Sequence, residues 1–211
     1  MKMLQMSIRK DFLEPDYYYH IFNRGINSSP IFKEEKNYDY FLKKFSEYIL
    51  EIADLYAFCL MPNHYHFVIK IKSEEELYNF SEANNLLYEQ VKEGVHSPKQ
   101  IASKQWSRFI GSYTLGYNKV YRRHGALLET PFKRKRILND MYLKNLIQYV
   151  HLNPEGINQD FRTYRYSSYS TFLGNHNTVL KREEVFDLFD NKENFIHCHN
   201  RKSNFDVEYD F

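Results

Sequence analysis

The spacing of apolar and polar residues predicts a chain that mixes strands with amphipathic helices. The aromatic run at 17–25 ends in a glycine and predicts a first strand followed by a polar loop. Apolar residues recur at helical spacing in 41–52, 106–120 and 140–153, and each segment predicts an amphipathic helix. Because Pro154 disfavours helical geometry in the residue before it, the last of these helices should end near Asn153.

A second strand is predicted within 60–71, and a further helix within 74–93. This order of elements favours an α+β fold, with a layer of antiparallel strands and helices packed on one face. Residues 1–174 are expected to form this domain. Residues 175–211 are more polar and are expected to form a C-terminal extension with a small helix and a flexible tail. In that extension we expect Glu184 to be solvated surface. The His197, Cys198 and His199 run could bind a metal, but in a mobile tail we expect it to be incidental.

Charge is unevenly distributed along the chain. The 211 residues carry a formal net charge of only +2, but the segment 117–136 holds seven basic residues and the single acid Glu129. Aromatic residues make up 18% of the chain, and basic side chains beside aromatic ones suit a nucleic-acid surface, although a solvated basic face is the alternative. The candidate DNA-binding residues are Asn23, Arg24, Arg122, Arg123, Lys133, Arg134, Lys135 and Arg136.

Composition also limits the compartment. Two cysteines cannot form a disulfide scaffold, and the first residues lack the apolar core of a signal peptide. No stretch has the length and apolarity needed to span a bilayer. We therefore expect a cytoplasmic protein without a membrane partner.

His64 and His66 are the most informative residue pair. Side chains alternate between the faces of a strand, so both imidazoles should project to one side, with Tyr65 and Phe67 on the other. The pair is compatible with histidines packed in a core, but it also suits half of an open metal site. The sequence has no spacing typical of a closed zinc site, which leaves Mg²⁺, Mn²⁺ or a related ion acting on a phosphate.

Tyr149 and Asn153 form a second candidate group. Positions i and i+4 of a helix share a face, so the phenol and the amide should point the same way. Tyrosine is a competent nucleophile toward a phosphodiester. Tyr149 could equally be one of 19 tyrosines that merely pack on a helix.

Several motifs taken together resemble a known family. Their order is Tyr19-His20-Ile21-Phe22-Asn23-Arg24-Gly25, Met61-Pro62-Asn63-His64-Tyr65-His66, Arg123-His124-Gly125, Phe132-Lys133-Arg134, Tyr149-Val150-His151-Leu152-Asn153-Pro154 and Tyr166-Ser167-Ser168-Tyr169. This succession resembles the single-tyrosine HUH transposases of the TnpA type, and most of all their REP-associated branch. The resemblance covers about residues 15–172.

The resemblance implies a ferredoxin-like fold and a metal-dependent transesterification on single-stranded DNA. It implies that His64, His66 and Asn153 bind a divalent ion, Mg²⁺ or Mn²⁺, and that Tyr149 is the nucleophile. The expected product is a 5′-phosphotyrosine link, and the expected partner is single-stranded DNA with hairpin ends of a mobile or repeated element. The family commonly pairs two copies, so a homodimer is possible. The alternatives are a nucleic-acid-binding protein without turnover and an HUH replication or relaxation nuclease.

Overall fold

A computed structural model describes residues 12–84 and 98–201 of the chain. The described strands are β1 (Tyr18–Arg24), β2 (Ala53–Met61), β3 (His64–Ile71) and β4 (Lys133–Arg136). They form one antiparallel sheet in the order β2-β3-β1-β4. Helix α1 (Glu35–Ile49) connects β1 to β2, and α3 (Pro98–Tyr121) precedes β4. This connectivity is the ferredoxin-like arrangement, so the predicted α+β class and antiparallel sheet are confirmed.

The predicted second strand is in fact the end of a hairpin. β2 and β3 are joined by Pro62 and Asn63, and Met61 lies opposite His64 in the register. The sequence pattern did not separate β2 because almost all of its residues are buried, which removes the alternation that marks a half-exposed strand. Helix α2 (Glu74–Ala83) begins at Ser73, whose side chain forms a capping box with Glu76. Residues 85–93 of the predicted helix 74–93 lie outside the described residues.

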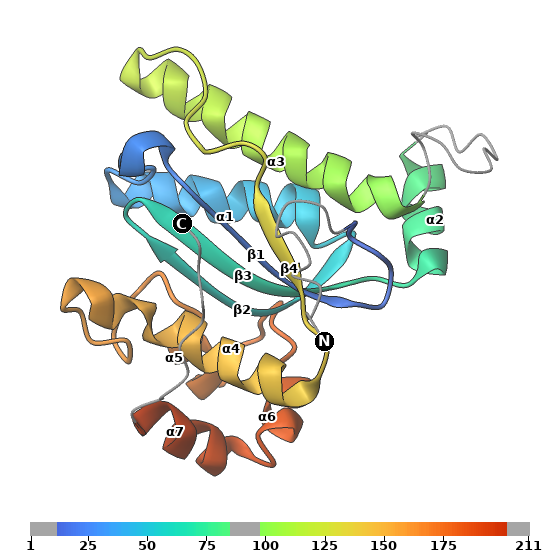
Figure 1. The fold of residues 1–211 in the computed structure, drawn as a ribbon, viewed down its shortest axis with the longest axis vertical. Coiled ribbons are helices and arrows are strands. Elements are labelled where there is room, and N and C mark those ends of the chain that lie inside the picture. Colours follow the sequence, from blue (N-terminus) through green and yellow to red (C-terminus); the bar gives the residue numbers. More distant parts are fainter. Residues whose placement is uncertain (1–11, 85–97, 202–211) are drawn as a thin grey trace, which may run out of the picture.

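One face of the sheet packs against α1 and α3 through aromatic rings (Figure 1). The Phe67 ring is stacked on Phe45 of α1 at 4.3 Å between centroids, and Trp106 of α3 meets it edge-on at 5.9 Å. Tyr65 lies 5.2 Å from Phe41 of α1. All five side chains are buried, and the burial of each one stabilises the fold by about 2 kcal/mol.

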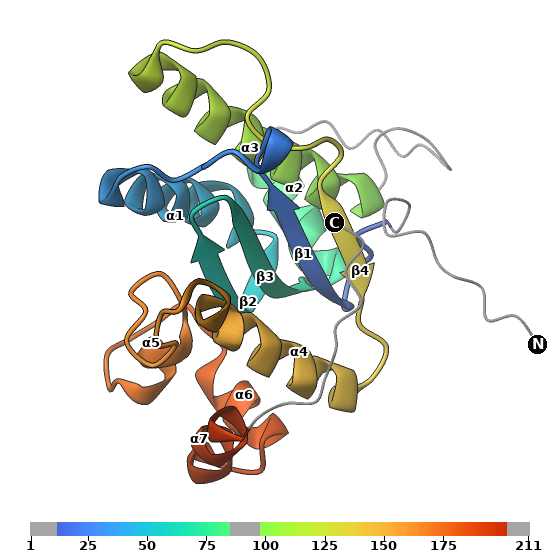
Figure 2. The same cartoon turned by 60° about the vertical axis from the view of Figure 1, so that its left-hand side comes forward.

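The other face of the sheet is also covered, which corrects the expectation that helices pack on one face only. Figures 1 and 2 show α4 (Asp140–Leu152) with α5 (Tyr169–Leu173), α6 (Arg182–Leu188) and α7 (Lys192–Asn200) on the side opposite α1 and α3. This second layer is needed because Phe22, Cys59, His66 and Val68 are buried on that face. Asn139 caps α4 by accepting a hydrogen bond from the Tyr142 backbone N–H.

The segment after Gly174 is more structured than its composition suggests. It contains α6 and α7, and Val185, Phe189 and Phe195 belong to the same buried apolar cluster as the sheet. The rest of the predicted flexible tail, from 202 onward, lies outside the described residues. The predicted small helix is therefore a pair of helices packed beneath α4.

Candidate active site

The two histidines of β3 lie on the face covered by α4. Their ring centroids are 5.1 Å apart and the rings meet edge to face. His66 is fully buried, and His64 is partly exposed. The strand alternation therefore places them as predicted, on the face away from Tyr65 and Phe67.

Helix α4 brings Tyr149 and Asn153 to these histidines. The Tyr149 ring lies 5.7 Å from the His66 ring, nearly perpendicular to it. The Asn153 Oδ1 atom lies 3.4 Å from Nε2 of His64. The four side chains thus converge from β3 and from one helix that follows β3 by about seventy residues in the chain.

Hydrogen bonds orient the ligand atoms of His64 and Asn153. The Nδ1 atom of His64 lies 2.7 Å from Oδ1 of Asn63, and because an amide oxygen only accepts, Nδ1 is the protonated nitrogen. The Asn153 amide nitrogen donates to the Tyr149 carbonyl at 2.9 Å, which turns Oδ1 toward His64. The Nε2 lone pair and the Oδ1 lone pairs then face each other, and this is an arrangement that a shared cation stabilises.

Burial keeps both imidazoles neutral, which metal binding requires. Desolvation lowers the pKa of His64; the hydrogen bond that only the doubly protonated ring can donate to Asn153 partly opposes this effect. Desolvation also lowers the pKa of His66 well below its usual range, with further contributions from His20 and His64. Both rings therefore present lone pairs at neutral pH.

The donor set could hold a divalent ion. Two imidazole nitrogens and one amide oxygen carry no negative charge, so a bound cation would keep its charge for an anionic substrate. Within 12–84 and 98–201 no group of three or more His, Cys, Asp or Glu side chains could hold a metal. The candidate site is not such a group, because its third donor is the amide of Asn153 and only two of its donors are histidines.

Two of the predicted DNA-binding residues lie beside this site. Arg24 lies opposite His64 across β1 and β3, and Lys133 lies opposite Phe22, so both occupy the histidine face. Glu129 holds them together, at 2.6 Å from Arg24 Nε and 3.6 Å from Lys133 Nζ. Burial is the largest single influence on the pKa of Glu129 and raises it, but Arg24 and Lys133 together outweigh it and lower the pKa below its usual value.

The other predicted DNA-binding residues do not form one patch. Lys135 shares the histidine face, whereas Arg134 and Arg136 alternate to the opposite face of β4. Arg136 pairs with Glu14 at 2.7 Å, and Arg122 and Arg123 lie just beyond α3.

Asn23 is buried, and its amide donates to the Glu129 carbonyl at 2.8 Å. In this structure it supports the loop that carries Glu129. A direct contact between Asn23 and DNA stays a prediction.

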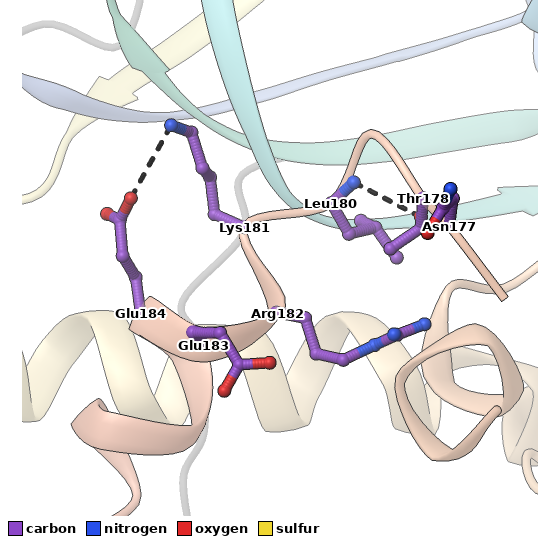
Figure 3. Close-up of a pocket in the computed structure, with 7 residues that line it drawn as sticks. All are labelled: Asn177, Thr178, Leu180, Lys181, Arg182, Glu183 and Glu184. Carbon is purple, nitrogen blue, oxygen red and sulfur yellow. Dashed lines mark hydrogen bonds and ion pairs between the residues drawn. The ribbon is translucent and has the colours of Figure 1, made fainter. Parts of the chain in front are cut away.

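A separate pocket lies away from this site. Figure 3 shows residues from the single segment 177–184 around it, with Lys181 and Glu184 paired at 3.5 Å. Lys181 also meets Asp54 at 3.4 Å. The Glu184 side chain is 49% exposed, as expected for a solvated residue, and it also accepts a hydrogen bond from the Tyr56 hydroxyl. Two charged residues of this pocket, Lys181 and Glu184, are thus already engaged in ion pairs.

A chain of hydrogen bonds ties α7 to the helix that carries Tyr149. His199 Nδ1 donates to the Phe195 carbonyl at 2.7 Å, which leaves Nε2 to accept from His151 Nδ1 at 2.9 Å. His151 Nε2 in turn accepts from the Ser168 hydroxyl at 2.7 Å. His199 is therefore a buried residue of α7, and the expectation that this run lies in a mobile tail is wrong.

Sequence reasoning missed three residues around the site: His20, Asn63 and Glu129. The alternation of β1 could have placed His20 on the histidine face with Phe22 and Arg24. Nothing in the local pattern indicates that His20 meets His66 or that Glu129 reaches back to Arg24.

Comparison with known proteins adds information at the level of the fold. No protein-family model and no curated protein matches the chain. A solved structure of a REP-associated tyrosine transposase bound to a REP hairpin is similar to it, with a TM-score of 0.54 and 10% sequence identity. The match covers 82% of this chain and 90% of the other. The similarity shows a shared fold. Among the described residues, no helix is long and apolar enough to cross a membrane.

Proposed function

We propose that this chain is a transposase-type enzyme that cleaves and rejoins single-stranded DNA through a 5′-phosphotyrosine intermediate in DNA transposition. The observation that supports this most directly is the convergence of Tyr149 and Asn153 with His64 and His66. A nucleophile beside a neutral metal-ligand set is what phosphodiester transesterification requires. The shared fold with a hairpin-bound tyrosine transposase agrees with this assignment.

In the proposed reaction, the Tyr149 oxygen attacks the scissile phosphorus and loses its proton. A phosphorus–tyrosine oxygen bond forms as the bond to the 3′ oxygen breaks, and that oxygen takes up a proton and leaves as a hydroxyl. A 3′-hydroxyl from another strand reverses the step, so the phosphodiester bond is conserved. His64, His66 and Asn153 would hold Mg²⁺ or Mn²⁺, which when bound polarises the phosphate as a Lewis acid.

The charged neighbours of the site would position the DNA. Arg24 is part-exposed beside His64 and presents a guanidinium that suits bidentate contact with a phosphate. Lys133 adds a second cation on the same face. Because the similar solved structure holds a REP hairpin, we propose hairpin-bearing single-stranded DNA as the substrate.

The test is covalent capture of the intermediate. A hairpin oligonucleotide labelled at its 3′ end is incubated with the protein and Mn²⁺ and then separated in SDS. We expect a labelled protein adduct that disappears in Tyr149→Phe and persists in Tyr142→Phe, which removes a hydroxyl from the same helix. A label at the 5′ end should instead appear in a shorter free fragment.

Other outcomes would identify the alternatives. Salt-sensitive DNA binding without an adduct would contradict the enzyme assignment and indicate a binding protein. An adduct formed at a site in DNA that lacks hairpins would indicate a replication or relaxation nuclease. An adduct that survives in Tyr149→Phe would overturn the assignment of the nucleophile.

A further inference from the structure

His20 is a fully buried histidine that lies against the candidate metal site without belonging to its donor set. It sits on β1 two residues before Phe22, which lies opposite His66. Its ring is stacked on the His66 ring at 5.2 Å and on the Phe22 ring at 4.6 Å. Because the Phe22 and His66 ring centroids are 5.9 Å apart, the three rings form one compact group on the sheet face under α4.

A hydrogen bond joins the two histidines. The His20 Nε2 atom lies 3.0 Å from Nδ1 of His66. Both rings are fully buried. In a hydrogen bond between two imidazole nitrogens, one nitrogen carries the proton and the other accepts it. The direction of this bond decides where His66 keeps its remaining lone pair.

Only one direction is compatible with a metal ligand. If His20 donates, neutral His66 carries its proton on Nε2 and has no lone pair for a cation at that atom. If His66 donates from Nδ1, the Nε2 lone pair is available. His64 already follows the second pattern, because its Nδ1 faces the Asn63 oxygen at 2.7 Å.

We propose that His20 is a positioning residue that accepts the Nδ1 proton of His66 and thereby fixes the tautomer and ring orientation that bind the divalent ion. This inference rests on the proposed function, because the orientation of His66 matters only if the site binds a divalent ion. Partners of this kind usually are carboxylates or carbonyls. A neutral imidazole in that place adds no negative charge, so the donor set stays neutral and the charge of the ion is left for the DNA phosphate.

The first test reads the tautomer directly in the wild-type protein. Long-range ¹H–¹⁵N NMR spectra of the metal-free protein at pH 7.5 distinguish a protonated Nδ1 from a protonated Nε2. We expect His66 to carry its proton on Nδ1. A proton on Nε2 of His66 would overturn the proposal.

The second test measures metal affinity without any reaction. Mn²⁺ binding is followed by the electron paramagnetic resonance signal of the free ion. His20→Phe keeps a stacked ring but removes the acceptor, and we expect it to weaken Mn²⁺ binding about 10- to 100-fold. His20→Gln returns an acceptor near the position of Nε2 and should recover most of the affinity. His199→Gln, on α7, is the matched control and should bind Mn²⁺ like the wild type.

The outcomes separate this inference from the proposed function. Equal Mn²⁺ affinity in folded His20→Phe and wild type would overturn the role of His20. If His20→Phe fails to fold, His20→Gln is compared with His20→Leu. Equal Mn²⁺ affinity in these two variants would overturn the role of His20. If the wild-type protein forms no DNA adduct but His20→Phe still lowers Mn²⁺ affinity, the enzyme assignment is contradicted and the positioning role of His20 is supported.

Discussion

The His151–His199 pair makes the stability of the protein depend on pH in a way that can be worked out from the structure. His199 is buried under α4, and desolvation lowers its pKa from 6.5 to about 4, although the bond to the Phe195 carbonyl opposes the shift. In the unfolded chain the same ring has its ordinary pKa. Between these two values the unfolded state therefore binds a proton that the folded state excludes.

The sign and size of the effect follow. The stability that neutral His199 contributes is fully present above pH 6.5 and is lost as the pH falls toward 4. From pH 7.5 to pH 5 the loss is about 2 kcal/mol for this one residue. His199→Gln can still accept the His151 proton but does not titrate, so its free energy of unfolding should fall by about 2 kcal/mol less over the same interval.

Urea unfolding at the two pH values measures this difference, and the fluorescence of Trp106, the single tryptophan, reports on the core. His197 lies on the exposed side of α7, so His197→Gln is the matched control. Its free energy of unfolding should change with pH as that of the wild type does. If His199→Gln loses as much stability on acidification as the wild type does, the assignment of a neutral, buried His199 is refuted.

Three further predictions address the sheet and the site. Phe67→Ala should lower the free energy of unfolding by about 3–5 kcal/mol in urea titrations, because the ring is fully buried between α1 and α3; a loss below 1 kcal/mol would contradict this packing. Glu129→Gln should release Arg24 and Lys133 to bind phosphate, which raises single-stranded DNA affinity and steepens its salt dependence by about 0.7 per added contact, whereas Glu47→Gln should change neither. Mn²⁺ and DNA should each tighten the binding of the other in titration calorimetry, and independent binding would argue against a neutral donor set that shares its ion with a phosphate.

Local periodicity accounts for what the sequence alone determined. His64 and His66 share a face because a strand alternates with period two, and Tyr149 and Asn153 share a face because a helix returns after four residues. The helices at 41–52, 106–120 and 140–153 are predicted because each has one apolar stripe. In the structure α1 begins at Glu35 and α3 at Pro98, six and eight residues before the predicted starts, whereas α4 begins at Asp140 as predicted. These relations involve residues close in the chain and need no knowledge of the rest of the molecule.

Tertiary structure alone decided which of these faces meet. The hydrogen bonds between His20 and His66 and between His151 and His199, and the ion pair between Glu129 and Arg24, join residues 46, 48 and 105 positions apart. The covering of the second sheet face by α4 and α7 was likewise not predicted, because burial on both faces erases the alternation from which a buried side is inferred. Such contacts depend on how whole surfaces pack against each other. The residues that neighbour a position along the chain do not determine which surface packs opposite it.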